Sequence, residues 1–200
     1  MLDRPETIER LREALISVER SRRRERELRA AESCLLDVAR VLALAEHPYE
    51  TFSLLINALR DVLPFQDAAV LVRSDDGALR AAARTSAWLA ALRLGPGRMV
   101  SRVARGEIVV LYDAAMVPEW REQPEEVRAR ASSVIHVPLR TSTVAPVVFV
   151  CTHEDRTRFE QRHIQIAKRL VPLAEPILRK LDLRVLPRPA NQAGRRALAH

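Results

Sequence analysis

Histidine and cysteine side chains are the first candidates for chemistry, because they act as nucleophiles, acid–base groups and metal ligands. Cys151 and His153 lie two residues apart at the end of an apolar run. Successive residues of a strand alternate sides, so these two side chains would share one face. Two ligands do not complete a metal site, and we expect a buried cysteine and an exposed histidine at a strand end. His136 lies in a second apolar run, where it could contact haem or another ligand, although a histidine satisfied by hydrogen bonds is the more common arrangement.

Sequence signatures of the common enzyme classes are absent. The 200 residues contain no His-Glu-x-x-His, Cys-x-x-Cys, Gly-x-Ser-x-Gly or P-loop pattern. Zinc hydrolases, thiol oxidoreductases, serine hydrolases and P-loop nucleotidases therefore lose their usual markers. Five glycines are too few for the common phosphate-binding loops. We expect a chain without enzyme activity and without a metal site, and the sequence identifies no cofactor.

The positive charge of the chain is concentrated near its C-terminus. The net charge is +7. Residues 1–47 carry 10 basic and 10 acidic side chains, residues 48–153 carry 12 and 11, and residues 154–200 carry 11 and 5. Nucleic-acid binding needs clustered basic residues that contact phosphates. A basic patch is therefore not expected on the body of the protein, and only the C-terminal part could bind nucleic acid or an acidic partner.

The cellular location follows from three simple features. Apolar runs such as Pro146–Cys151 are far shorter than the roughly 20 residues needed to span a bilayer, and no secretory signal is visible. The two cysteines, Cys34 and Cys151, cannot build a disulfide framework. These features predict a cytoplasmic protein.

The first 45 residues show the periodicity of a coiled-coil helix. Apolar residues recur at alternating spacings of three and four, in a first run of Ile8, Leu11, Leu15 and Val18 and a second run of Leu28, Ala31, Leu35, Val38, Leu42 and Ala45. The two runs are one residue out of phase across the arginine-rich stretch 21–27, and such a break changes the local winding of a coiled coil and could act as a register switch.

Two interpretations of this helix remain open. In one, it forms a parallel homodimer, with a seam made of Ile8, Leu11, Leu15, Val18, Leu28, Leu35 and Leu42. In the other, it packs back on its own domain. We favour the dimer, because an isolated helix with so narrow an apolar stripe needs a partner.

The remaining chain alternates between helical and strand-like patterns. Helices are predicted over 49–63, 99–105, 127–131 and 159–183, and strands over 68–73, 78–85, 108–112, 134–139 and 144–152. Asp75-Asp76-Gly77 indicates a hairpin turn, and Gly106 is placed to end a helix in the left-handed conformation. Pro172 and Pro176 lie within the last helix, which we expect them to kink.

This order of elements resembles the GAF family of sensor domains from about residue 34 to residue 182. The matching positions are Gly97, Val103, Gly106-Glu107, the strand 108–112 with Asp113, Trp120, the segment Ser133–Leu139 and Phe159. The resemblance implies an α+β fold with a GAF-like antiparallel β-sheet flanked by helices. The expected organisation is an N-terminal coiled-coil helix over 1–33, a sensor domain over 34–183 and a basic tail or linker over 184–200.

Two departures from the family pattern limit what the resemblance implies. The final hairpin lacks its usual glycines and carries Pro146, which is typical of an edge strand or a bulge. Members that bind cyclic nucleotides carry an Asn-Lys pair and an acidic pair where this chain has His153-Glu154 and His163-Ile164. The resemblance therefore does not imply a cyclic-nucleotide ligand.

Large side chains near the loops that enclose the pocket in GAF domains form the candidate ligand site: Trp88, Met99, Tyr112, Trp120 and His136. Aromatic walls suit a flat, apolar ligand. The same side chains would equally fill a pocket that binds nothing.

The resemblance implies a bacterial signal-transduction domain without enzyme activity of its own. Such a domain dimerises through helices and couples the binding of a small molecule or a partner protein to an output domain, such as a diguanylate cyclase or a histidine kinase. One alternative is a ligand-free scaffold for protein interaction. Another is a binder of nucleic acid or of an acidic partner through the basic tail.

Overall fold

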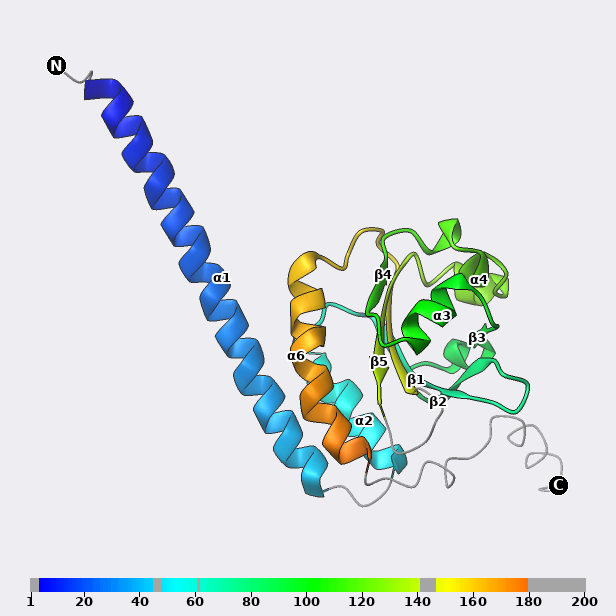
Figure 1. Cartoon of the computed structure of the whole chain (residues 1–200). Helices are drawn as coiled ribbons and strands as arrows, with labels where there is room; N and C mark the ends of the chain where they lie inside the picture. Colours follow the sequence, from blue (N-terminus) through cyan, green and yellow to red (C-terminus); the bar gives the residue numbers. More distant parts are fainter. Residues whose placement is uncertain (1–3, 45–47, 61, 141–146, 180–200) are drawn as a thin grey trace.

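A six-stranded antiparallel sheet forms the centre of the protein (Figure 1). The structure, a computed structural model, describes residues 4–44, 48–60, 62–140 and 147–179. The strand order is β3-β2-β1-β6-β5-β4, with β1 Asp67–Arg73, β2 Leu79–Arg84, β3 Arg93–Leu94, β4 Val109–Leu111, β5 Ser133–Leu139 and β6 Val147–His153. The helices are α1 Arg4–Leu44, α2 Pro48–Leu59, α3 Arg98–Ala104, α4 Pro118–Arg121, α5 Glu125–Arg128 and α6 Gln161–Leu178, with 3-10 turns at Ala87–Ala91 and Ala114–Met116.

Helices cover both faces of this sheet. All of β5 and all but the last residue of β6 are buried, which explains why these central strands have nearly continuous apolar sequences. Alternate residues point to opposite faces: Ile135 packs toward α2 and α6, whereas Val134 packs toward α3, α4 and α5. The predicted α+β fold with flanking helices is confirmed. Pro146 lies outside the described residues, and β6, which follows it, is a central strand.

Two glycines close the turns that the sequence predicts. Gly77 ends the β1–β2 turn at φ +80°, and Gly106 follows α3 at φ +90°, a region that residues with a Cβ rarely adopt. In the first turn, Asp76 accepts hydrogen bonds from Arg80 at 2.8 Å and Arg93 at 3.2 Å. The carboxylate thereby links the turn to the guanidinium groups of β2 and β3.

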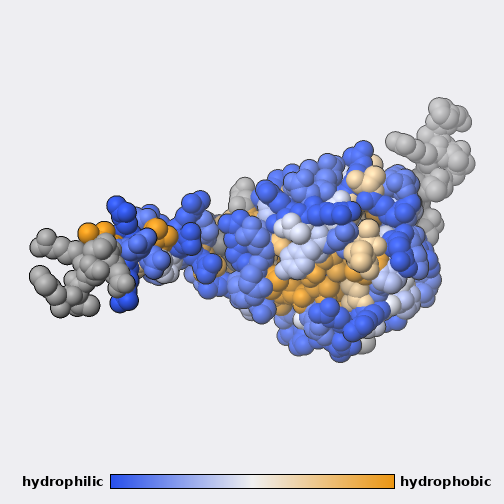
Figure 2. All heavy atoms as spheres, turned by 90° about the horizontal axis from the view of Figure 1, so that it is seen from above, coloured by the Kyte–Doolittle hydropathy of each residue, from blue (hydrophilic) through white to orange (hydrophobic). Residues whose placement is uncertain are grey.

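The long helix α1 extends away from the sheet at its N-terminal end and lies beside α6 and α2 at its C-terminal end (Figure 1). Its side chains from Ile8 to Glu27 are exposed, and apolar ones are visible among hydrophilic ones in Figure 2. Leu28, Cys34 and Ala39 are half-buried. The helix continues without a break through residues 33 and 34, the predicted boundary between helix and domain.

The two apolar runs of α1 therefore have different surroundings. Ile8, Leu11, Leu15 and Val18 are 48–63% exposed. At about 100° per residue, Leu15 lies roughly 140° around the helix from Leu28 and roughly 120° from Ala39. The C-terminal part of α1 packs on the protein's own domain, whereas the first run stays exposed. The side chains of Leu35 and Leu42 are outside the described residues.

Helix α6 runs through both of its prolines. Pro172 and Pro176 are exposed, so the carbonyl groups that lose a backbone donor can be hydrated. Near its N-terminus, Arg162 lies 3.6 Å from Glu27, and Arg169 pairs with Glu32, which joins α6 to α1. Among the described helices, none has the length and apolar character that crossing a membrane requires. The predicted tail at 184–200 is outside the described residues.

Candidate ligand site

A hydrogen-bonded pair of Trp120 and His136 lies on the sheet face covered by α3, α4 and α5. The indole Nε1 of Trp120 donates to Nε2 of His136 at 3.1 Å, and the two rings meet edge to face with centroids 5.6 Å apart. Both side chains are buried. The second ring nitrogen, Nδ1, lies 3.3 Å from the carbonyl oxygen of Val109 on the neighbouring strand β4. Because Nε2 accepts, the proton of the neutral imidazole belongs on Nδ1.

Burial keeps this imidazole neutral. Loss of solvation lowers the pKa of His136 to about 4, and the hydrogen bond to the Val109 carbonyl opposes the shift only in part. His136 is therefore an uncharged acceptor near pH 7, with a lone pair that points at Trp120.

Two further side chains from the segment that carries Trp120 bind other elements. Glu119 accepts a hydrogen bond from the backbone N–H of Met99 in α3 at 2.8 Å. Gln123 accepts from the Arg93 N–H at 3.0 Å and donates to the Arg93 carbonyl at 2.7 Å, as a neighbouring strand would. We call Glu119, Trp120 and Gln123 the α4 clasp, because they tie one short segment to α3, β5 and β3.

Gly97 leaves the space that the clasp requires. A Cβ at this position would collide with the carboxylate of Glu119. The backbone of Gly97 is extended at φ −170°, a conformation open to any residue. The constraint at Gly97 is therefore steric contact with Glu119 rather than backbone strain.

The structure brings four of the five predicted pocket residues to this face. Trp88, Met99 and Trp120 belong to one apolar cluster, and His136 lies beneath Trp120. Tyr112 is 49% exposed and lies outside that cluster. A role of these residues in binding stays a prediction. Glu119 and Gln123 were not predicted, and their contacts across 20 and 30 residues leave no local sequence signal.

Trp88 is held by a second polar group on the same face. Its indole Nε1 donates to Oδ2 of Asp67 at 3.1 Å. The same carboxylate accepts from the hydroxyl of Thr85 at 3.0 Å and from Ser86. Both tryptophans thus have a defined acceptor, a nitrogen for Trp120 and a carboxylate for Trp88.

Cys151 and His153 do not form a reactive site. Cys151 is fully buried toward α2 and α6, and burial raises the pKa of its thiol, which disfavours the nucleophilic thiolate. His153 is half-buried rather than exposed, and its Nδ1 accepts the Asp155 N–H at 2.9 Å. Within the described ranges, no three His, Cys, Asp or Glu side chains are grouped to hold a metal ion.

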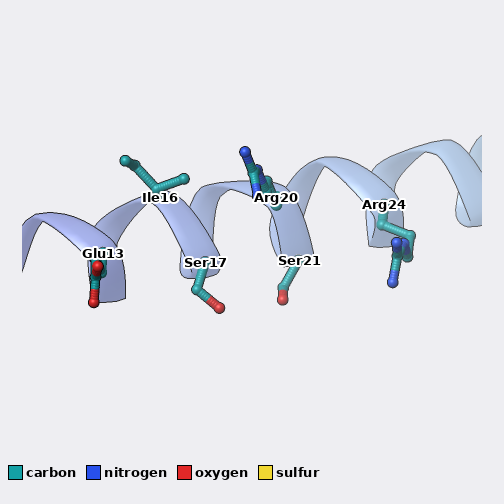
Figure 3. Close-up of a pocket in the computed structure, with 6 residues that line it drawn as sticks. All are labelled: Glu13, Ile16, Ser17, Arg20, Ser21 and Arg24. Atoms are coloured by element: carbon teal, nitrogen blue, oxygen red, sulfur yellow. The ribbon is translucent and has the colours of Figure 1, made fainter.

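Hydrogen bonds within the protein satisfy the polar side-chain atoms of its interior. Throughout the part of the chain that is described, no buried side-chain nitrogen or oxygen lacks a hydrogen-bond partner. A shallow hollow lies on the surface of α1, away from the buried interior. Its lining residues all come from one side of this single helix (Figure 3): Glu13, Ile16, Ser17, Arg20, Ser21 and Arg24. Exposed side chains of one helix do not enclose a ligand, and we assign no site there.

Comparison with known proteins identifies the fold through structure alone. No family model and no curated protein matches the sequence. A GAF domain of a phosphoenolpyruvate-protein phosphotransferase from Coxiella burnetii is 18% identical, with a TM-score of 0.59 over 73% of this chain and 92% of its own. The phycoerythrobilin-bound GAF domain of a cyanobacterial phytochrome is 11% identical, with a TM-score of 0.58 over 74% and 94%.

An enzyme has the same architecture. Free methionine-R-sulfoxide reductase from Neisseria meningitidis, in complex with its substrate, is 18% identical, with a TM-score of 0.62 over 74% of this chain and 87% of its own. The chain thus has a GAF-like fold, which occurs both in GAF domains of larger proteins and in a reductase. The prediction that the chain is not an enzyme is therefore wrong, because an enzyme has the same fold.

Proposed function

We propose that this chain is the sensory domain of a cytoplasmic bacterial signalling protein, and that it works as a parallel homodimer. Its GAF-like fold, which it shares with domains of a phytochrome and of a phosphotransferase, supports the sensory role. In this proposal, a small molecule or a partner protein acts on the GAF-like domain over 34–183. The helices then carry the change to an output domain such as a diguanylate cyclase or a histidine kinase.

The exposed first run of α1 is the observation that carries the dimer. Ile8, Leu11, Leu15 and Val18 leave about half or more of their surface in water, although burial of such side chains contributes roughly 1.5–3 kcal/mol each. The C-terminal half of α1 is occupied by its own domain. A second copy of the same helix, paired in parallel, would bury the first run at a and d positions.

Contacts between α1 and α6 support the coupling. Arg162 pairs with Glu27 and Arg169 with Glu32, at the end of α1 that adjoins the domain. Helix α6 follows β6 in the chain and packs against β5, which carries His136. A change at the candidate ligand site would therefore reach α1 through β5 and α6.

Sedimentation equilibrium tests the dimer with a matched pair of variants. Wild type is expected to be a dimer, and Leu15→Glu is expected to be a folded monomer. The control is Ile16→Glu, because Ile16 is also exposed but lies about 100° around the helix from Leu15, and this variant should remain dimeric. A monomeric wild type, or equal disruption by both substitutions, would contradict the proposed dimer.

A second candidate is a scaffold that binds no small molecule. The satisfied interior around Trp120 and His136 favours it. Thermal unfolding across a panel of nucleotides and metabolites separates the two, because a ligand that binds the folded state raises the unfolding midpoint. A raised midpoint supports the sensor, and an unchanged midpoint across the panel supports the scaffold.

A further inference from the structure

Trp120 occupies its site in the manner of a bound ligand. A planar ring donates one N–H to a buried, neutral acceptor on the sheet, and flanking carboxylate and amide groups bind backbone atoms of α3 and β3. We propose that the α4 clasp is a displaceable internal occupant, and that the site beneath it takes a planar heterocycle with an N–H donor. This inference rests on the sensory function proposed above and names the chemistry of its ligand.

The fixed tautomer of His136 determines what the site accepts. Nδ1 donates to the Val109 carbonyl, so Nε2 can only accept. A ring without an N–H would leave this buried acceptor unpaired, which is unfavourable. The site therefore discriminates between two rings of equal shape by about tenfold or more when only one of them carries the donor.

The clasp is built to open more readily than the sheet beneath it. Helix α4 has four residues, too few for a helix to be stable without outside contacts. Pro118, Arg121 and the following Glu122 are exposed, whereas β5 is buried along its whole length. Segments with few buried contacts open locally at a lower free energy than the core. Trp120 is thus a buried side chain on a segment of low intrinsic stability.

Hydrogen exchange of the Trp120 indole N–H in the wild-type protein tests whether the clasp opens. The proposal predicts exchange at least about tenfold faster than that of the slowest backbone amides of β5 and β6, because only the clasp must open. Exchange at the same rate as those amides would mean that Trp120 is released only by global unfolding, and would overturn the proposal. This test requires no variant.

Gly97→Ala sharpens the exchange experiment. The added methyl group would collide with the Glu119 carboxylate and expel it from α3, while Trp120 and His136 keep their identities. We expect faster exchange of the Trp120 indole in this variant, with unchanged exchange in β5 and β6. The control is Gly95→Ala, because a Cβ at Gly95 meets nothing within 4 Å. Equal exchange in the two variants would count against the clasp.

Chemical rescue tests the class of ligand. Trp120→Ala should bind free indole at least about tenfold more tightly than benzothiophene, a ring of similar shape without the N–H. The rise of the thermal unfolding midpoint with the concentration of each ring measures this difference. Phe149→Ala is the control: it removes a fully buried ring on the apolar face, and it should show no such preference because a phenylalanine ring has no N–H and needs no acceptor. Equal action of the two rings on Trp120→Ala would overturn the donor requirement. If Trp120→Ala does not fold, the exchange measurement on wild type decides the proposal.

These results are independent of the dimer. A monomeric wild type with rapid exchange at Trp120 would contradict the proposed dimeric mechanism and leave the ligand site standing. A dimeric protein with slow exchange at Trp120 would contradict the ligand site alone.

Discussion

The two faces of the central sheet are covered by side chains of different chemistry. The face toward α2 and α6 is packed with aliphatic and phenylalanine side chains around Phe149, which meets Phe65 edge to face at 6.4 Å. The opposite face contains two hydrogen-bonded tryptophans, with His136 and Asp67 as their acceptors. Apolar packing stabilises a fold without directional requirements, whereas placed polar groups give selectivity in a ligand site. We therefore propose that the first face contributes mainly to stability and that the second also serves recognition.

The largest expected effect comes from breaking the apolar face. Phe149→Ala removes a fully buried ring and should lower the free energy of unfolding by about 3–5 kcal/mol. Urea unfolding measures the loss. Phe149→Leu, which keeps most of the apolar contact, should cost less. A loss below about 1 kcal/mol in Phe149→Ala would contradict the assignment of stability to this face.

Low pH should reduce the stability that the face with His136 contributes. His136 titrates near pH 4 when folded and near 6.5 when unfolded, so the unfolded chain binds the extra proton between these values. Stability contributed by the neutral imidazole is therefore complete above pH 6.5 and falls by about 3 kcal/mol as the pH drops to 4. His163, whose pKa burial also lowers, acts in the same direction.

The contribution of His136 is measured by difference. His136→Gln keeps an acceptor near Trp120 but does not titrate, so unfolding of this variant should lose less stability between pH 6.5 and pH 4 than wild type. His163 and the carboxyl groups are present in both proteins, so their contributions cancel in the difference. Identical losses in the two proteins would show that His136 is not held neutral by burial.

The smallest effect compares the two tryptophans. Trp120→Phe leaves the buried Nε2 of His136 without a donor and should cost about 1–3 kcal/mol. Trp88→Phe should cost less, because Asp67 still accepts from Thr85 and Ser86. Urea unfolding of both variants gives the ranking. A larger cost for Trp88→Phe would reverse the order proposed for the two sites.

Sequence patterns predicted the sheet better than the site. The runs around Val134–Leu139 and Val147–Thr152 indicate strands because central strands need apolar residues on both faces, and Gly77 and Gly106 mark turns that require positive φ. Of the clasp, Trp120 was predicted as a pocket residue, whereas Glu119 and Gln123 were not, because they bind backbone atoms far away in the chain. Periodicity alone also does not distinguish an apolar stripe that packs on its own domain from one that stays exposed, and α1 carries both, with Leu28 half-buried and Leu15 exposed.

The central claim is that opening of the clasp changes the arrangement of the two α1 helices. Double electron–electron resonance, which measures distances between spin labels, tests it most directly. A spin label at Ser21→Cys, in a Cys34→Ser background, reports the separation of the two α1 helices in a dimer, since Ser21 is exposed and Cys151 is buried. We predict one defined distance between copies, and a different one when Gly97→Ala releases the clasp. The same distance in both proteins, or no distance between copies at all, would contradict the account.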